Sequence, residues 1–175
     1  MKSPPPSNVA FSPAVKKVQQ ALGSRELYKK VEDGKGWRTE IDDQFAAFIA
    51  MRDSFYLASA SAEGQPYVQH RGGPPGFLKV IDPGTLAFAD FTGNRQYITA
   101  GNLSENNRVQ LFLMDYANSR RVKIWGAAKA VDDDAALMKL LHDPDYAGKP
   151  ERAIVISTTA WDVNCTRHIP ALYTN

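Results

Sequence analysis

The sequence predicts a mainly β protein with a few flanking helices, in which antiparallel strands form a barrel or a sandwich. Six or seven short apolar runs are separated by turn residues such as Asp82, Pro83 and Gly84, and this spacing is typical of strands joined by hairpins. Helical segments do not alternate regularly with these runs, which disfavours a doubly wound nucleotide-binding fold. The 175 residues suffice for one domain with its own core and are too few for two domains of typical size.

Residues 1–36 are predicted to form an arm followed by short helices. Proline and serine are frequent at the start of this stretch. A first helix is expected to begin at Ser12, which can cap it, and Pro13, which suits its first turn. Gly23 is expected to end that helix, and a second short helix is expected over residues 25–31.

The rest of the chain is predicted to be rich in strands. Ile41, Phe45, Phe48 and Ile49 recur at helical spacing, and Thr39 can cap the helix that they form. The segments that favour helix are residues 39–51, 94–103 and 132–141. The segments that favour strand, by alternation or by their turn boundaries, are residues 54–61, 67–71, 77–81, 85–91, 109–114, 121–131 and 153–160.

Composition and charge exclude several classes of protein. Hydrophobic residues make up 43% of the chain and charged residues 23%, which is typical of a globular protein. No stretch approaches the ~18 apolar residues of a membrane span, and the first residues lack the apolar core of a secretory signal. The net charge of +2 argues against a general nucleic-acid binder. The single cysteine, Cys165, cannot form an intrachain disulfide, so we expect a soluble, cytoplasmic protein.

The common nucleotide, hydrolase and metalloprotease motifs do not occur in the sequence. Cys165 and His168 form a C-x-x-H pair, but this pair offers two ligands where a structural zinc site needs four. The favoured interpretation is a buried thiol beside a polar residue of the tail. We therefore expect no metal site.

Three separated cations occur within residues 69–96, namely Arg71, Lys79 and Arg95. Arg95 follows a turn and is expected to open the helix over residues 94–103. A helix N-terminus offers unpaired N–H groups and a favourable dipole, so cations that converge on it suit a phosphate. Taken singly, each cation fits an exposed side chain at a strand end. Together, and with nearby glycines that allow close backbone approach, they predict an anion site.

Several segments of this sequence resemble a known family. They are QHRGGPPGFLKV, LAFADFTGNRQYITAGNL, NNRVQLFLMDY and RRVKIWGAAKAV. These segments resemble the FMN-binding split-barrel family related to pyridoxamine 5'-phosphate oxidase, over roughly residues 45–131. The tail WDVNCTRHIP resembles the C-terminal signature of one uncharacterised branch. The resemblance implies an N-terminal arm and helical extension over residues 1–36 and an FMN-binding split-barrel domain over residues 37–175.

The resemblance also implies what the protein does. In that family the cofactor lies in a groove between the two subunits of a homodimer. The expected activity is that of an FMN-dependent oxidoreductase acting on an unknown small-molecule substrate. The Arg-x-His substrate motif of the oxidase is not clearly matched by residues 166–169, so pyridoxamine phosphate itself is not the expected substrate.

Residues that match the family's motifs are expected to hold the phosphate of FMN. Arg71 and Lys79 match the arginine and lysine that flank the strand lying along the cofactor, and Arg95 matches the arginine that binds the phosphate. Gln96 stands where the oxidase often has a lysine. Phosphate binding would therefore depend more on Arg71, Lys79 and Asn94.

Other matching residues are expected to contact the rest of the cofactor. Ala89 and Asp90 match a pair that contacts the flavin or its ribityl chain. Arg121 falls where a glutamine of the partner subunit often reaches the flavin, and either it or Gln69 is expected to donate to the pyrimidine edge. The full set expected to bind FMN is Gln69, His70, Arg71, Lys79, Ala89, Asp90, Asn94, Arg95, Gln96 and Arg121.

The residue pattern leaves some points open. His70 and His168 are the acid–base candidates, and no catalytic residue is assigned. The aromatic residues that could form a wall for the flavin ring are Phe88, Phe91, Trp125 and Trp161; core packing is favoured for Phe88 and Trp125. The alternatives to an FMN enzyme are a split barrel that binds deazaflavin or haem, and a flavin-binding module without catalysis.

Overall fold

The computed structural model describes residues 4–34, 36–163, 165–170 and 172. The first three residues of the predicted arm lie outside the described residues, as do Lys35, Asn164 and positions 171 and 173–175 of the predicted tail. None of the helices in the described part of the chain has the length and apolarity needed to cross a bilayer.

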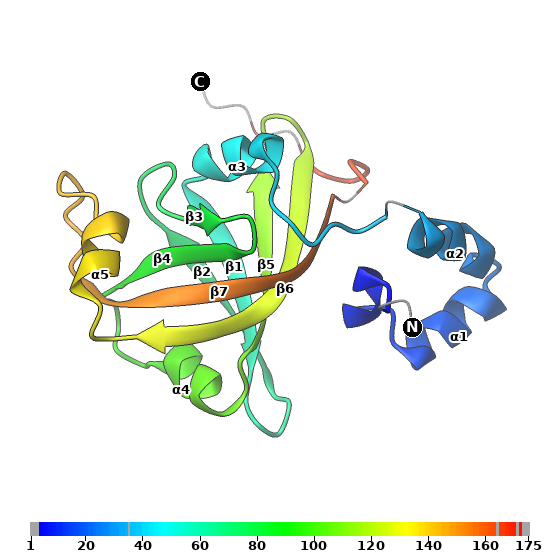
Figure 1. The fold of residues 1–175 in the computed structure, drawn as a ribbon, viewed down its shortest axis with the longest axis horizontal. Helices are drawn as coiled ribbons and strands as arrows, with labels where there is room; N and C mark the ends of the chain where they lie inside the picture. The colour runs from blue at the N-terminus through cyan, green and yellow to red at the C-terminus, as the bar shows by residue number, and fades with distance from the viewer. Residues whose placement is uncertain (1–3, 35, 164, 171, 173–175) are drawn as a thin grey trace.

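Seven strands form one antiparallel sheet, in the order β2-β1-β5-β6-β7-β4-β3 (Figure 1). The strands are β1 (Ser54–Ala60), β2 (Pro66–Gly72), β3 (Lys79–Asp82), β4 (Thr85–Phe91), β5 (Arg108–Asp115), β6 (Arg120–Val131) and β7 (Pro150–Val163). The sheet and its flanking helices confirm the predicted mainly β fold, and the similar structures described below confirm the split barrel.

The core lies on the inner face of this curved sheet. In β5 and β6 buried and partly exposed residues alternate, as expected for strands with one face on a core. Leu111, Ile124 and Ile156 are completely buried on that face. Gly126 marks a register shift between β6 and β7, where a Cβ atom would lie 2.4 Å from the carbonyl oxygen of Ser157. A side chain at position 126 would therefore push the two longest strands apart.

Three helices flank the barrel: α3 (Asp43–Ala50), α4 (Ile98–Glu105) and α5 (Ala135–Leu141). All three begin later than predicted. The caps of α3 and α5 explain two of the shifts: Asp42 accepts from the backbone N–H of Phe45 at 2.8 Å, and Asp134 accepts from that of Leu137 at 2.8 Å. A carboxylate at the N-cap satisfies a free N–H group and fixes the first turn. The predicted cap of α3, Thr39, lies outside the helix.

The N-terminal extension contains η1 (Pro6–Val9), α1 (Pro13–Ala21) and α2 (Arg25–Asp33), and it lies to one side of the barrel (Figure 1). Its two predicted helices are present, and Ser12 caps α1 by accepting from the N–H of Val15 at 3.3 Å. Gly23 follows α1 with a positive φ of 74°, which glycine adopts without strain. The domain boundary at residue 36 stays a prediction.

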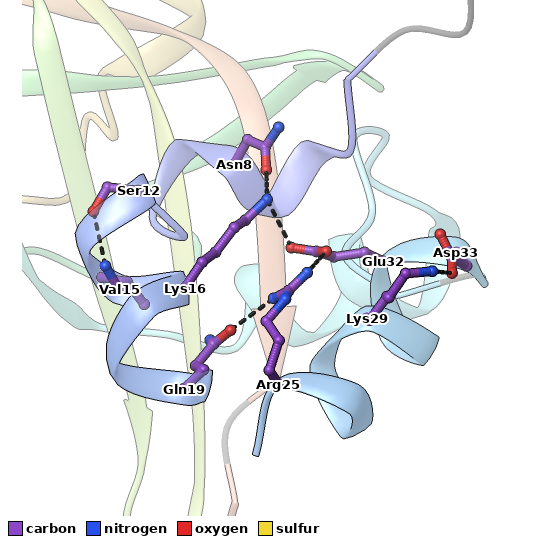
Figure 2. Close-up of polar contacts among 9 residues, drawn as sticks. All are labelled: Asn8, Ser12, Val15, Lys16, Gln19, Arg25, Lys29, Glu32 and Asp33. Carbon is purple, nitrogen blue, oxygen red and sulfur yellow. Dashed lines mark hydrogen bonds and ion pairs between the residues drawn. The ribbon is translucent and has the colours of Figure 1, made fainter. Parts of the chain in front are cut away.

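Charged and polar side chains hold η1, α1 and α2 together (Figure 2). Lys16 donates to Asn8 at 2.6 Å and pairs with Glu32 at 3.2 Å. Arg25 pairs with the other oxygen of Glu32 and donates to the side chain of Gln19 at 2.7 Å. The apolar side chains of α1 point elsewhere, since Val18 is 56% exposed and Leu22 is 79% exposed. The extension therefore has a polar interior.

An aromatic stack fastens the extension to the outer face of β6. The Trp37 ring stacks on Trp125 with 4.6 Å between centroids and 16° between planes. Phe11 lies 5.1 Å from Trp37 and 5.3 Å from Tyr28 of α2. The ammonium group of Lys123 lies 5.2 Å from the Trp37 ring and 5.1 Å from the Trp125 ring, within range of cation–π attraction.

Candidate functional site

The candidate site lies where the barrel is not closed by backbone pairing. β2 is the last strand at one end of the sheet order, and β4 is next to last at the other end. In the described chain no ladder of backbone hydrogen bonds joins these two strands. Their side chains meet instead, through an ion pair between Arg71 of β2 and Asp90 of β4. We call this junction the seam.

The ion pair at the seam leaves one donor without a partner. The side chains of Arg71 and Asp90 are only 12% and 13% exposed. The guanidinium carbon of Arg71 lies 5.6 Å from the Phe88 ring centroid. One terminal nitrogen of Arg71 binds Asp90, but Nε is buried and has no hydrogen-bond partner among the described residues. This nitrogen is therefore available to donate to a ligand at the seam, although within the described part of the chain the Nε atoms of Arg52, Arg121 and Arg152 are buried without a hydrogen-bond partner as well.

A cavity of about 210 Å³, here the seam cavity, opens beside this ion pair. It is lined by Tyr67, Gln69, Arg71, Asp90, Phe91, Gly93, Asn94, Arg95, Gln96, Tyr97, Ile98, Thr99, Ala100 and Glu151. Six of the residues predicted to bind the cofactor therefore lie around one space. Thr99 fixes Gln69 by donating to its side-chain oxygen at 2.9 Å, which leaves the amide nitrogen of Gln69 available as a donor.

The turn that carries Arg95 differs from the prediction. The helix α4 begins at Ile98, so Arg95 precedes it by three residues and does not open it. Arg95 and Tyr97 both have left-handed backbones, with φ of 61° and 53°. A right-handed helix cannot contain such residues, and each costs ~1–2 kcal/mol of strain outside glycine. Asn94 stabilises the turn by accepting from the N–H of Gln96 at 3.2 Å.

The guanidinium group of Arg95 is exposed and partly oriented. Its Nε donates to the hydroxyl of Tyr97 at 3.3 Å. This hydrogen bond, with the smaller influence of the Glu151 carboxylate, raises the pKa of Arg95 above its ordinary value. Arg95 is therefore a permanent cation at the rim of the seam cavity.

A second space of about 160 Å³ continues the seam cavity along β2 and β4. It shares Gln69, Arg71 and Phe91 with the seam cavity and adds His70 and Ala89. Two further predicted residues thus adjoin the same groove. Phe91 faces both spaces and packs on Tyr146 at 5.0 Å.

The other three candidate wall residues are buried or stacked in the protein. Phe88 lines the second space but is almost fully buried, and it packs against Phe55 in the core. Trp125 stacks on Trp37. Trp161 is buried 4.0 Å from the Phe45 ring and donates from Nε1 to the carbonyl of Glu40.

The glycines of this segment have different surroundings. A Cβ atom at Gly73 would lie 2.7 Å from Cγ of Phe77, so the missing side chain makes room for the core. A Cβ atom at Gly93 would meet nothing within 4 Å, and Gly93 lines the seam cavity. Close approach of a ligand to the backbone at Gly93 stays a prediction.

Two predicted residues, Lys79 and Arg121, do not line the seam cavity. Lys79 opens β3 opposite Ala87 and is half-buried. Arg121 lies on the outer face of β6 and lines another cavity of about 520 Å³, the outer-face cavity. The remaining residues that line the outer-face cavity are Tyr56, Ala58, Val68, Gln110, Phe112, Met114, Tyr116, His168, Ile169 and Pro170.

The predicted metal-ligand and acid–base candidates do not line the seam cavity in the part of the chain that the structure describes. Among the described residues no three His, Cys, Asp or Glu side chains gather as metal ligands would. The thiol of Cys165 is exposed, so the predicted burial of this residue is wrong; it lies in the tail, beyond the last core strand. His70 packs on the Tyr56 ring at 5.6 Å, and His168 lines the outer-face cavity.

Six residues that line the seam cavity were not predicted from sequence: Tyr67, Tyr97, Ile98, Thr99, Ala100 and Glu151. Thr99 lies on the buried side of α4, which a helical pattern starting at Ile98 would have indicated. Glu151 comes to the cavity because β7 pairs with the end of β4, where Phe91 faces Pro150. No local pattern around Glu151 marks such long-range pairing.

The donors around the seam cavity fit the phosphate end of FMN. Two guanidinium groups, the amides of Gln69, Asn94 and Gln96, and three hydroxyl-bearing side chains surround it, and guanidinium groups in particular bind phosphate oxygens well. The volume of about 210 Å³ is smaller than the ~300–1,000 Å³ of most small-molecule pockets. The flavin ring of FMN would therefore extend into the adjoining space or beyond the subunit.

Comparisons with known proteins agree with this architecture. A family model described as pyridoxamine 5'-phosphate oxidase matches residues 41–164. No curated protein matches the chain. HupZ from Group A Streptococcus has a similar structure, with a TM-score of 0.55 and 16% identity over 67% of this chain and 89% of that chain.

Two further solved structures are similar. One is a Clostridium acetobutylicum protein related to general stress protein 26, of the pyridoxinephosphate oxidase family, with a TM-score of 0.53 and 15% identity over 75% of this chain and 94% of that chain. The other is an FMN-binding protein from Syntrophomonas wolfei, with a TM-score of 0.52 and 16% identity over 87% of this chain and 95% of that chain. At these identities the structures establish a shared fold.

Proposed function

This chain belongs to the pyridoxamine 5'-phosphate oxidase family, and we propose from this premise that it is an FMN-dependent oxidoreductase with a small-molecule substrate. The observation that carries the proposal is the seam cavity, where Arg71 and Arg95 face one space together with amide and hydroxyl donors. The name of the similar S. wolfei protein, an FMN-binding protein, supports the choice of cofactor.

The residues of the seam divide between the two ends of the cofactor. Arg95, Asn94 and Gln96 would hold the phosphate at the rim. Arg71, with its unpaired Nε, would donate to the phosphate or the adjoining ribityl chain. When bound, FMN supplies the electron-transfer chemistry, while the protein supplies binding and orientation. Gln69, with its amide nitrogen left free by Thr99, would donate to the pyrimidine edge.

We further propose that a second copy of the chain covers the outer-face cavity and completes the site. The outer-face cavity is lined mainly by apolar and aromatic side chains, and Val68 within it is 61% exposed. Apolar surfaces of this kind mark association sites. Arg121 faces this surface and not its own seam cavity, so contact with FMN would require the seam cavity of the partner. A cytoplasmic location is part of the same proposal, because the one cysteine is an exposed free thiol.

The direct test is whether the purified protein retains FMN. We expect the flavin absorbance bands in the protein as isolated, or tight binding when FMN is added to the apoprotein. Parallel titrations with a deazaflavin and with haem would show whether the seam prefers one of those cofactors. A colourless protein that fails to retain added FMN would rule out the proposal.

The role of the seam cavity can be tested with Arg95→Ala. The arginine is exposed and makes no core contact, so folding should be unaffected while FMN affinity falls about 10- to 100-fold. This range corresponds to the ~1.5–3 kcal/mol of a charge-assisted hydrogen bond. Arg108→Ala, at an exposed position on β5, is the matched control and should bind FMN normally. Riboflavin, which lacks the phosphate, should bind equally to both variants.

A further inference from the structure

Tyr97 joins Arg95 to the first residues of β7. The Tyr97 hydroxyl accepts a hydrogen bond from Nε of Arg95 at 3.3 Å and donates to Oε1 of Glu151 at 3.4 Å. All three side chains line the seam cavity. One hydroxyl therefore connects the cation of the cavity to a carboxylate of the same cavity.

The Tyr97 ring is also held from the side of β7. The guanidinium carbon of Arg152 lies 5.4 Å from the Tyr97 ring centroid, and Arg152 pairs with Asp132 at 3.5 Å. Two consecutive residues of β7 thus contact the hydroxyl and the ring of one tyrosine. Since β7 pairs with β4 up to Phe91, Tyr97 is anchored to the rigid sheet.

This arrangement decides which nitrogens of Arg95 remain available. Nε is used by Tyr97, so the two terminal nitrogens are left to donate in parallel to one oxyanion. The planar fork of arginine recognises phosphate best in this bidentate manner. A free arginine on an exposed turn would sample many rotamers, and fixing Nε restricts them before the ligand arrives.

The carboxylate of Glu151 needs an explanation in a phosphate site. A negative charge there repels an anionic ligand, while the carboxylate of Asp90 is already neutralised by Arg71. Glu151 contributes an acceptor for the Tyr97 hydroxyl. Because the hydroxyl hydrogen points to Glu151, a lone pair of the hydroxyl oxygen stays directed at Nε of Arg95.

We propose that Tyr97 and Glu151 are positioning residues that aim the guanidinium fork of Arg95 at the phosphate of the ligand. This inference rests on the proposed function and adds two residues to it. Neither residue touches the phosphate in this arrangement; both act through Arg95.

The test compares FMN with riboflavin in fluorescence titrations of purified variants. Tyr97→Phe keeps the ring on Arg152 and removes only the hydroxyl. We expect its FMN affinity to fall about two- to tenfold, the change that corresponds to one hydrogen bond of typical strength, with riboflavin affinity unchanged. Tyr28→Phe, in the N-terminal extension, is the matched control and should behave as wild type. Thermal unfolding of each variant checks that the fold is intact.

A double-mutant cycle separates positioning from direct contact. If Tyr97 acts through Arg95, adding Tyr97→Phe to Arg95→Ala should cause no further loss of FMN affinity. Glu151→Gln and Glu151→Ala both remove the charge that repels the phosphate, so they are compared with each other. Glu151→Gln keeps an acceptor for the Tyr97 hydroxyl and should bind FMN about two- to tenfold more tightly than Glu151→Ala. An equal loss from Tyr97→Phe with and without Arg95 would overturn the inference.

The failure of this inference can be told from failure of the proposed function. If Arg95→Ala weakens FMN binding and Tyr97→Phe does not, the positioning role is wrong and the FMN site stands. If the wild type binds FMN and Arg95→Ala leaves the affinity unchanged, the phosphate assignment and the positioning role are wrong while FMN binding stands. If the wild type does not bind FMN, the proposed function is wrong and the inference falls with it.

Discussion

Asp115, at the end of β5, is a buried carboxylate that its neighbours keep charged. It accepts hydrogen bonds from the backbone and side-chain nitrogens of Asn118, each at 3.1 Å, and pairs with Arg52 at 3.2 Å. Burial alone would raise the pKa of Asp115, but the hydrogen bonds from Asn118 and the charge of Arg52 outweigh it. The pKa is therefore lowered from its ordinary value of 3.8.

This lowered pKa predicts how stability depends on pH. The folded protein binds fewer protons at Asp115 than the unfolded chain, so the stabilisation is complete well above pH 3.8 and is lost as the pH falls through the lower folded value. We expect Asp115→Asn to reduce the free energy of unfolding at neutral pH by about 1–3 kcal/mol, because buried donors lose a charged partner. Below pH 3.8 the difference from wild type should shrink.

Urea unfolding at a series of pH values measures this difference. Glu32, whose pKa is also lowered because its pairing with Arg25 and Lys16 outweighs its burial, affects both proteins equally, so the difference isolates Asp115. Asp145→Asn, at an exposed position, is the control. A constant difference between wild type and Asp115→Asn across the acid range would contradict the prediction.

Some residues of the candidate site could be predicted from the sequence, because their chemical type and their position in the chain are enough to indicate an anion site. The cations Arg71 and Arg95 and the amides of Gln69, Asn94 and Gln96 surround one cavity, as expected of an anion site. The left-handed backbones of Arg95 and Tyr97 were not foreseen, because glycine and asparagine are the residues that usually adopt them. The start of α4 was misplaced for that reason.

At the scale of elements, the N-terminal extension combines a polar interior with an aromatic attachment. Its helices are held by Glu32 and its partners, and the extension meets β6 through Trp37. An isolated pair of nine-residue helices is too short to be stable in water. The attachment to the barrel should therefore determine whether α1 and α2 stay folded.

Trp37→Ala tests this dependence. The substitution removes the stacks with Trp125 and Phe11, and aromatic pairs contribute ~0.5–1.5 kcal/mol beyond the area that they bury. We expect limited trypsin digestion, followed by mass spectrometry, to cut faster after the lysines of α1 and α2. The melting temperature of the barrel should change little.

Leu22→Ala is the matched control for this experiment, since Leu22 directly follows α1 as its C-cap and is largely exposed. It should be digested at the wild-type rate. If Trp37→Ala were cut no faster than Leu22→Ala, the aromatic stack would not be what holds the extension.

The strands were predicted better than the helix boundaries, for a physical reason. Alternation in β1, β5 and β6 follows directly from burial on one face and places their ends within one residue of the prediction. The ends of β4 also match the prediction, although Leu86, Ala87, Phe88 and Ala89 are all buried because both of its faces are covered. The strand β7 is six residues longer than predicted because it pairs with both β6 and β4, which no local pattern encodes. The strand β3 begins at Lys79, after Phe77 and Leu78 turn into the core.

At the scale of the whole molecule, two features of the barrel bear on the proposed assembly. The seam is closed by the side chains of Arg71 and Asp90, and the outer-face cavity is uncovered in the subunit. A second subunit over the outer face would bury its apolar residues and bring Arg121 to the partner's cofactor.

Val68→Asp tests this assembly. The residue lies in the outer-face cavity, and burial of an unpaired carboxylate there would cost several kcal/mol. We expect wild type to have the molar mass of a dimer by light scattering, and Val68→Asp to shift to a monomer and to lose FMN. Val18→Asp, on the exposed face of α1, is the control and should stay dimeric.

A wild-type protein that is monomeric and still retains FMN would contradict the two-subunit site.

The family and the fold were both predictable, because ordered motifs and strand spacing encode them within one chain. Whether two copies of the chain associate depends on the shape of a whole surface. The spacing of residues along the sequence says little about that shape.

The stack of Trp37 on Trp125 also gives this protein an intrinsic optical reporter. Two indole rings held 4.6 Å apart and 16° from parallel couple through their electronic transitions. The third tryptophan, Trp161, is buried against Phe45 on the other side of the sheet. The near-ultraviolet circular dichroism of the unlabelled protein should therefore contain a coupled signal that reports whether Trp37, the residue that Phe11 of the extension contacts, is stacked on β6. Release of Trp37 can thus be followed in real time without a dye.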